Sequence, residues 1–355
     1  MVGHLAAKTT NLPILSSVLL KTENKSLTVA STNLEVGIRH IIRCKVEEDG
    51  ECVVPARLLL ELLPLIPSGP LTITFREGGL TITSERGSTT LRSVPSAEFP
   101  IIPEVEHMVG FMVETQAIAH AFTTTLFAAG NVEHRPQFNG VLIHAEGKQA
   151  TFVATDGYRL AEAVVTLTKS VERWRAILPI TAVHEVIRMF DLPEQDSAVT
   201  LGGTESQVSV RTEGTDVVSR LVSGEYPDYL PLFPERATTT CVVSRAELTR
   251  ALKAAGLFAR TSLAEVKLTV DSSAGSVTVA AENAELGAHQ ASVVSKCQGS
   301  PVSVSVNARY LLDGLNALTT PNAVLAFTTP DRPLLLTPEG DTPVRFRYLV
   351  MPIRR

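Results

Sequence analysis

Asp156 and Arg159 are the residues whose types and spacing most suggest chemistry. An acid and a guanidinium three residues apart could act as a proton donor and a phosphate ligand. The motifs that accompany such chemistry are missing: the sequence has no glycine-rich phosphate loop, HExxH, GxSxG or carboxylate cluster with metal-ligand spacing. We therefore expect no catalytic residue, no metal and no cofactor.

The histidines and cysteines support the same interpretation. The eight histidines are scattered, and His120 and His184 lie on amphipathic segments where surface or rim positions are expected. The four cysteines have neither CxxC spacing nor a partnering histidine cluster; they are Cys44, Cys52, Cys241 and Cys297. This usage predicts buried thiols in a reducing cytoplasm rather than disulfides or a zinc site.

Length and composition indicate a multidomain globular protein. The 355 residues exceed one ordinary core, and 44% are hydrophobic while 19% are charged. A formal net charge of -5 argues against a protein that coats DNA with a basic surface, so any nucleic-acid contact must come from a local patch. No run of 18 apolar residues and no basic-then-apolar start is present. We expect a cytoplasmic protein without a membrane partner.

The elements around Asp156 form a predicted hairpin. An extended run, residues 151–154, meets the polar turn Thr155-Asp156-Gly157, and a second apolar run continues to Val165. Asp-Gly between two such runs favours a tight turn, because glycine readily takes the positive φ required there.

The hairpin is one copy of a threefold internal repeat. Val18-Leu19-Leu20 corresponds to Val141-Leu142-Ile143. The strand–turn–strand pattern occupies residues 12–42, 138–165 and 265–294. A strand followed by a short helix occupies 51–66, 176–190 and 302–318, and paired strands follow at 71–94, 198–222 and 323–350. The spacing predicts an opening strand and helix at 110–129 and 240–259, with Ser244 and Glu247 forming a capping box.

The first repeat is short by roughly 20 residues, because residues 1–8 could hold only the end of its first helix. A truncated chain, a mis-assigned start and a reduced domain remain open explanations. Proline-rich linkers at 95–103 and 226–234 divide the chain into predicted domains 1–103, 104–232 and 233–355. Each should be α+β, with two helices on one face of about eight antiparallel strands, and the outer sheets should run on between repeats.

Four motifs in order resemble the bacterial sliding clamps, the β subunits of DNA polymerase III. They are ATDGYRLA at 154–161, SGEYPDY at 223–229, the helix at 306–318 and YLVMPIR at 348–354. The resemblance covers nearly the whole chain. It implies three DNA-clamp domains in a crescent, with sheets outside and helices inside. Two crescents would close head to tail around duplex DNA, because a heterologous contact that closes after two copies makes a ring.

The resemblance also implies one hydrophobic pocket for partner peptides in each chain, because only the middle repeat carries Gly-Tyr-Arg-Leu at its turn. Its predicted residues are Phe138, Thr155, Gly157, Tyr158, Arg159, Leu160, Pro227, Pro231, Leu232, Leu349, Val350, Met351, Pro352, Ile353 and Arg354. Arg159 and Arg354 could bond peptide carbonyls or carboxylates at the rim. Leu230-Pro231 stands where the family often has basic residues, which removes a basic edge.

Sequence-independent DNA binding needs only scattered cations on the inner helices. The candidates are Lys8, Arg57, Arg135, Arg188, Arg250, Lys253, Arg260 and Arg309; each could equally belong to a solvated helix face. The segment 115–129 carries only His120, so the pore should be weakly basic. Homodimer contacts are expected near Leu91, Leu257 and Phe258, although these three could also be core residues.

The expected function is a non-enzymatic processivity factor. Its partners would be duplex DNA, the replicative polymerase catalytic subunit, a clamp loader, clamp-binding peptides of repair proteins and a second copy of the chain. One alternative is a clamp-like paralogue or truncated form that binds peptides without closing a stable ring, which the short first repeat favours. A β-rich repeat enzyme or carbohydrate-binding module would need a carboxylate pair or an aromatic platform, and one Trp with five Tyr disfavours the platform.

Overall fold

The computed structural model describes residues 2–6, 12–23, 25–76, 78–105, 109–130, 132–191, 197–259 and 263–354. The chain forms two compact units. Unit 1 comprises Met1–Gln116 and Thr181–Leu221, and unit 2 comprises Ala117–Ile180 and Val222–Arg355.

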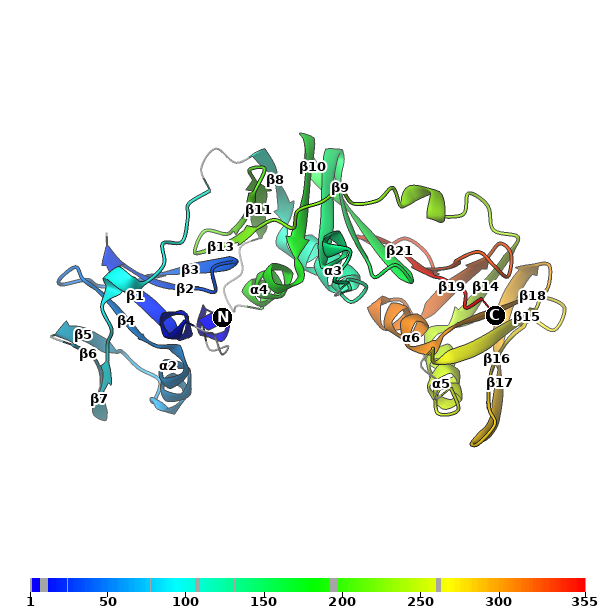
Figure 1. The fold of residues 1–355 in the computed structure, drawn as a ribbon, viewed down its shortest axis with the longest axis horizontal. Coiled ribbons are helices and arrows are strands. Elements are labelled where there is room, and N and C mark those ends of the chain that lie inside the picture. Colours follow the sequence, from blue (N-terminus) through cyan, green and yellow to red (C-terminus); the bar gives the residue numbers. More distant parts are fainter. Residues whose placement is uncertain are drawn as a thin grey trace. The chain divides into compact units, whose positions relative to one another are not determined.

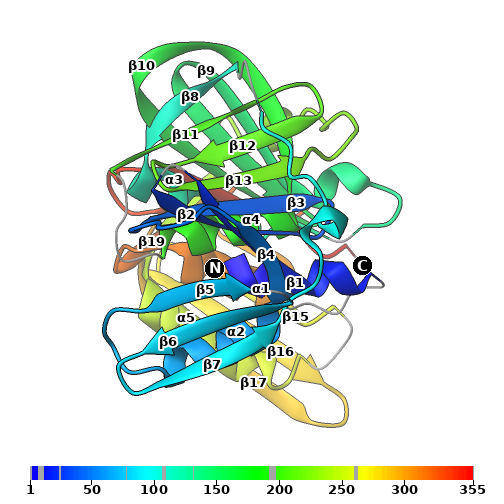
Figure 2. The same cartoon turned by 90° about the vertical axis from the view of Figure 1, so that its left-hand side faces the viewer.

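Unit 1 contains an eight-stranded antiparallel sheet and a three-stranded one (Figures 1 and 2). The larger sheet has the order β4 (Glu51–Pro55), β1 (Ser17–Glu23), β2 (Ser26–Thr32), β3 (Val36–Arg43), β13 (Thr215–Arg220), β12 (Gln207–Arg211), β11 (Ala198–Gly203) and β8 (Val109–Glu114). The smaller sheet is β5 (Thr72–Arg76), β6 (Gly79–Ser84) and β7 (Gly87–Arg92). Its helices are α1 (Val2–Ala6), α2 (Ala56–Leu62) and α4 (Ile180–Phe190).

Unit 2 is built on one ten-stranded antiparallel sheet. The strand order is β18 (Val302–Asn307), β15 (Glu265–Asp271), β16 (Ser276–Asn283), β17 (Gly287–Gly299), β14 (Thr239–Ser244), β19 (Asn322–Phe327), β20 (Leu334–Pro338), β21 (Arg345–Val350), β10 (Arg159–Pro179) and β9 (Gly140–Thr155). Its helices are α3 (Thr115–Leu126), α5 (Arg245–Gly256) and α6 (Ala308–Ala317).

The predicted repeat of strands and helices is confirmed. Each repeat contributes two helices, which are α1 and α2, α3 and α4, and α5 and α6. Helices α2 and α4 each begin directly after a strand-ending proline, Pro55 and Pro179. Ser244 caps α5 as predicted, because its hydroxyl accepts the Glu247 N–H at 3.4 Å, which is one of the two bonds of a capping box.

The outer sheets run on from one repeat to the next, as expected. In unit 1, β3 of the first repeat pairs with β13 of the middle repeat, from Val36 opposite Ser219 to His40 opposite Thr215. In unit 2, β10 of the middle repeat pairs with β21 of the last, and Arg159 lies opposite Val350. We call these pairings the first seam and the second seam. Because each seam ties part of the middle repeat to a neighbour, the compact units divide that repeat between them.

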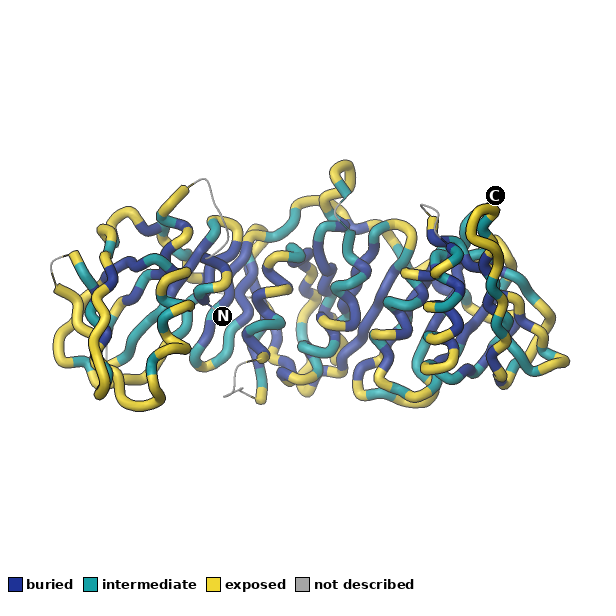
Figure 3. Tube along the Cα trace, turned by 90° about the horizontal axis from the view of Figure 1, so that it is seen from below, coloured by how far each residue is buried: buried dark blue, intermediate teal, exposed yellow. Residues whose placement is uncertain are grey.

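The core is aliphatic, as the low aromatic content requires. Buried segments, dark blue in Figure 3, run through both units. Strand β5 differs, because all five of its residues are exposed and, among the described residues, it pairs with β6 alone. The corresponding strands β11 and β19 are also paired with the opening strands β8 and β14. No helix in the described ranges has the length and apolarity to span a bilayer.

Candidate functional site

The turn between β9 and β10 is held by its own side chains. One carboxylate oxygen of Asp156 accepts the backbone N–H groups of Tyr158 at 2.9 Å and Arg159 at 3.0 Å. The Thr155 hydroxyl accepts the Gly157 N–H at 3.0 Å and donates to the Arg159 carbonyl. Gly157 has φ of 92°, a conformation that glycine takes without a Cβ penalty. These bonds fix the direction in which Tyr158 and Arg159 leave the turn.

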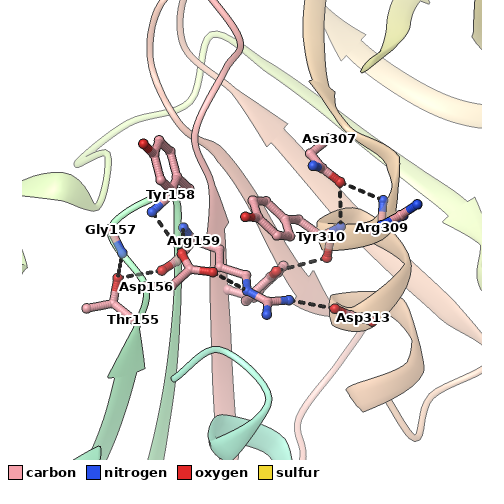
Figure 4. Close-up of polar contacts among 10 residues, drawn as sticks. Thr155, Asp156, Gly157, Tyr158, Arg159, Asn307, Arg309, Tyr310 and Asp313 are labelled. Atoms are coloured by element: carbon pink, nitrogen blue, oxygen red, sulfur yellow. Dashed lines mark hydrogen bonds and ion pairs between the residues drawn. The ribbon is translucent and has the colours of Figure 1, made fainter. Parts of the chain in front are cut away.

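Arg159 links the turn to helix α6 (Figure 4). Its Nε donates to Asp156 Oδ2 at 2.9 Å and its Nη1 to Asp313 Oδ2 at 2.5 Å. The guanidinium lies 4.5 Å from the Tyr310 ring centroid and 5.7 Å from that of Phe127, and its side chain is only 13% exposed. The chain's own carboxylates and rings therefore surround the guanidinium, and the expected bond from Arg159 to a peptide stays a prediction. These contacts join the turn to α6.

The C-terminal tail lies beside this turn. Leu349 is opposite Leu160 in the second seam, and the Met351 N–H donates to the Tyr158 carbonyl at 2.9 Å. The tail then crosses to β18, where the Ile353 N–H donates to the Ser305 carbonyl at 2.8 Å. Arg354 Nη2 is 3.5 Å from the Asp331 carbonyl oxygen. The structure thus brings together two predicted parts of the site that are nearly 200 residues apart.

The predicted pocket residues divide by exposure into a buried floor and an accessible surface. The buried residues are Phe138, Thr155, Leu160, Leu349 and Val350. The half-buried and exposed residues are Gly157, Tyr158, Pro227, Pro231, Leu232, Met351, Pro352, Ile353 and Arg354. Tyr158 is 66% exposed. The floor supports these residues, while a binding partner can reach only the second group.

Tyr226 belongs to the floor although the sequence analysis did not include it. Its ring packs edge-on against Phe138 with centroids 5.8 Å apart, within a cluster that contains Leu160 and Leu349. Burial raises the pKa of Tyr226 well above its ordinary value. Because Tyr226 anchors the linker, Pro227 and the residues after it are held over the cluster. Its place in the SGEYPDY motif was the available signal.

Two arginines supply positive charge around the cluster. Arg135, predicted to face DNA, has its guanidinium 5.6 Å from the Phe138 ring centroid and is exposed. Arg175, which the sequence analysis did not select, donates from Nη2 to the Tyr226 carbonyl at 3.1 Å. The basic edge that Leu230-Pro231 does not provide is therefore available from β10 and from the loop before Phe138.

The other predicted DNA-facing cations are less uniform. Lys8 and Arg260 lie outside the described residues. Arg57 pairs with Glu61 at 2.9 Å and Arg188 pairs with the buried Glu185, so carboxylates offset both charges. Three of the predicted cations in unit 2 are exposed on helices: Arg250 and Lys253 on α5 and Arg309 on α6.

The predicted dimer contacts stay predictions, and the structure gives the surroundings of each residue. Leu91 is 7% exposed and lies opposite Leu80 in the small sheet, so its side chain is a core residue. Leu257 is 61% exposed, and Phe258 stacks on His289 with centroids 5.9 Å apart. An open groove of about 460 Å³ lies between α5 and residues 289–294 of β17. Within the described chain, β7 pairs only with β6, and Gly287–Val294 of β17 pairs only with β16, so both strands keep a free edge.

No cluster of three or more His, Cys, Asp or Glu suited to a metal is found in the ranges that the structure describes.

Comparisons with known proteins match the chain along its length. Three family models match in order: the N-terminal domain of the DNA polymerase III beta subunit over residues 2–103, the central domain over 112–228 and the C-terminal domain over 231–354.

Individual relatives agree with the family models. A beta sliding clamp from Synechococcus elongatus is 27% identical over 360 residues, covering 100% of this chain and 95% of the relative. One from Chlamydia muridarum is 28% identical over 356 residues, covering 99% of this chain and 94% of its own. The crystal structure of a sliding clamp from Pseudomonas aeruginosa bound to griselimycin has a TM-score of 0.92 at 26% identity, covering 100% of this chain and 95% of that one. The chain belongs to the bacterial beta sliding clamp family, the DNA polymerase III beta subunits that act as polymerase processivity clamps.

Proposed function

We propose that two copies of this chain close into a ring around duplex DNA in the cytoplasm. The ring would tether the replicative polymerase and repair proteins through the surface beside the middle turn. The observation that carries the proposal is the second seam, which sets the tail against the one turn with the Gly-Tyr-Arg-Leu sequence. The protein performs no covalent chemistry in this role, and a separate clamp loader would open the ring because the sequence has no nucleotide-binding loop.

The surface suits short hydrophobic peptides. Met351, Pro352 and Ile353 are half-buried and follow Leu349, which belongs to the apolar cluster with Leu160. A flexible methionine beside aliphatic residues accepts varied apolar side chains. Arg135 and Arg175 add positive charge at the floor's aromatic rings, which favours peptides that also carry an acidic residue or a free carboxylate.

Ring closure would use the two free strand edges. Pairing β7 of one copy with the β17 edge of another uses backbone hydrogen bonds, and exposed residues such as Leu257 and Val294 lie near the β17 edge. Because this contact joins different surfaces, two copies related by a twofold axis close it twice. The exposed cations of α5 and α6 would then make nonspecific phosphate contacts. Arg57 and Arg188 would contribute less, because Glu61 and Glu185 offset their charges.

Peptide binding is tested with a labelled C-terminal peptide of a bacterial replicative polymerase. Deleting residues 351–355 should lower affinity at least tenfold, and Tyr158→Ala should lower it severalfold. Leu286→Ala, at the corresponding turn of the last repeat, is the matched control and should bind normally. Circular dichroism checks that each variant is folded. Unchanged affinity in the folded deletion variant would reject this site.

Ring formation is tested separately by sedimentation. A mass of twice the 38.2 kDa chain is expected at micromolar concentration. A monomer that still binds the peptide would instead support the alternative of a clamp-like protein that does not close a stable ring. The incompletely paired β5 of the first repeat is the observation that favours this alternative.

A further inference from the structure

Cys241 and Cys297 lie directly opposite each other on the adjacent antiparallel strands β14 and β17. Side chains of directly opposite residues project from the same face of a sheet. Their Cα atoms are about 4.5–5.5 Å apart in antiparallel pairs, within the range of about 4.4–6.8 Å found for disulfides. The backbone therefore already holds the two cysteines at a separation that a disulfide can bridge.

The two thiols have different surroundings. Cys241 is completely buried, and burial followed by contact with the Cys297 thiol raises its pKa. Cys297 is half-buried, with its sulfur 4.0 Å from the Ser276 carbonyl oxygen. A small oxidant would thus reach Cys297 first, while Cys241 lies behind it.

The remaining cysteines provide an internal contrast. Cys52 is buried opposite Leu20, and burial raises its pKa to about 11. Cys44 is exposed just after β3, where its N–H donates to the Lys25 carbonyl. The strand pairing sets neither of these two against another cysteine. Only the pair on β14 and β17, among the described strands, has the register for a cross-strand disulfide.

We propose that Cys241 and Cys297 form an oxidative modification site, closed as a reversible cross-strand disulfide by a peroxide. The Cys297 thiolate attacks one peroxide oxygen, which breaks the O–O bond, gives a sulfenic acid and releases hydroxide. The Cys241 sulfur then attacks the sulfenic sulfur and displaces the second hydroxide. The two sulfurs lose two electrons and two protons, so two thiols and one hydrogen peroxide give one disulfide and two waters.

The bond would link β14 to β17 close to the point where β17 changes partner. Residues up to Val294 pair with β16, and residues from Ser295 pair with β14. A disulfide here joins the two parts of the sheet covalently and restricts the unfolded chain between residues 241 and 297. The melting temperature of the oxidised protein should rise on the order of 5 °C. Because Cys241 is slow to ionise, closure should require sustained rather than brief exposure to peroxide.

The test counts free thiols in the reduced protein before and after treatment with hydrogen peroxide. Maleimide labelling of the unfolded protein should fall from three sites to one in a Cys44→Ser background, which removes the exposed thiol. A non-reducing peptide map should show the fragments with Cys241 and Cys297 joined, and dithiothreitol should restore three labels. Cys52 should remain labelled throughout.

Two further variants keep the proposal falsifiable. Cys241→Ser should abolish both the linked fragment and the rise in melting temperature, and its Cys297 should proceed to a sulfinic acid. Cys52→Ser, which removes the other buried thiol, should leave the linked fragment unchanged. The proposal is overturned if Cys241 stays fully labelled after peroxide treatment, or if Cys297 becomes sulfinic acid in the protein that retains both cysteines.

Discussion

The turn between β2 and β3 in unit 1 and the turn between β9 and β10 in unit 2 share one hydrogen-bond scheme. Asn33 Oδ1 accepts the N–H groups of Glu35 and Val36, as Asp156 Oδ1 accepts those of Tyr158 and Arg159. Thr32 repeats the bonds of Thr155, accepting one N–H and donating to one carbonyl. The last repeat keeps the first part of the scheme, with Asn283 Oδ1 accepting two N–H groups.

The two turns differ in the residues that the scheme presents. The fully buried Val36 stands where the middle turn has Arg159, and Leu34 takes φ of 75° where the middle turn has Gly157. The Asx hydrogen bonds are thus a common scaffold. The middle copy gains a link to α6 through Arg159 and loses a bulky residue at the turn, which clears the surface beside the tail.

The strands that leave the two turns form the two seams, and both seams carry an arginine–carboxylate pair. Arg39 Nη2 binds Asp216 at 2.9 Å in the first seam, and Arg347 Nε binds Glu162 at 2.8 Å in the second. The first seam adds His40, whose Nδ1 lies 2.8 Å from the Thr215 hydroxyl. Both seams therefore share an arginine–carboxylate pair, and the regions differ at the turns and at His40.

Removing the link to α6 should have the largest effect. Arg159→Ala should lower the free energy of unfolding by about 2–3 kcal/mol, because it leaves Asp156 15% exposed without its cation and uncovers the Tyr310 ring. Urea denaturation measures the change, and peptide affinity should fall as well because Tyr158 is no longer held.

The matched control for this variant is Arg57→Ala. The Arg57–Glu61 pair has a similar 2.9 Å distance but is 82% and 62% exposed, so its loss should leave the free energy of unfolding nearly unchanged. Arg159→Lys should be intermediate, because an ammonium keeps the charge and loses the two-pronged geometry. Equal destabilisation by Arg159→Ala and Arg57→Ala would show that the link to α6 has no structural role.

Sequence reasoning recovered what local patterns encode and missed what strand register decides. The Thr-Asp-Gly turn, the threefold repeat and the Ser244 cap each follow from neighbouring residues. The bond from Arg159 to Asp313 spans 154 positions and depends on how β10, β21 and α6 come together, so no local signal reports it.

The same limit explains the other corrections. Leu91 could be an interface or a core residue from its sequence alone, and alternation along β7 turns its side chain inward opposite Leu80. Cys241 and Cys297 were interpreted as isolated thiols because their spacing fits no motif, whereas the pairing of β14 with β17 sets them face to face. Cys44, expected to be buried, is exposed because it follows the end of β3.

Adding a side chain at the middle turn and removing one at the first turn should have opposite effects on the free energy of unfolding. Gly157→Ala should destabilise the protein by about 1 kcal/mol, because a Cβ is unfavourable at φ of 92°. The nearest atom to that Cβ would be 3.8 Å away, so the cost is conformational rather than steric. Leu34→Gly should be neutral or stabilise by up to about 1 kcal/mol, since Leu34 is 48% exposed and loses little burial.

Denaturant midpoints at unchanged m-values would measure this pair. Ala284→Gly, at the corresponding position of the last repeat, has no positive φ to relieve and serves as the control. Strong destabilisation by Leu34→Gly would mean that packing of the leucine, and not backbone conformation, governs the first turn.

The smallest expected effect is a pH dependence that distinguishes the seams. Burial lowers the pKa of His40, and a hydrogen bond involving the Gly214 backbone opposes this only partly. Below the ordinary histidine pKa of about 6.5, His40 therefore binds a proton more readily in the unfolded chain than in the folded chain. The stability that neutral His40 contributes is complete above that pH and should decline as the pH falls from 7.5 to 5.5.

His40→Gln isolates this contribution, because glutamine can still bond Thr215 and does not titrate. Its free energy of unfolding should fall less between pH 7.5 and 5.5 than that of the unmodified protein. His120→Gln on α3 is the matched control in unit 2, because burial also lowers the pKa of His120. It should flatten the pH profile without changing the response of the first seam. Parallel profiles for His40→Gln and the unmodified protein would show that His40 does not make the first seam sensitive to pH.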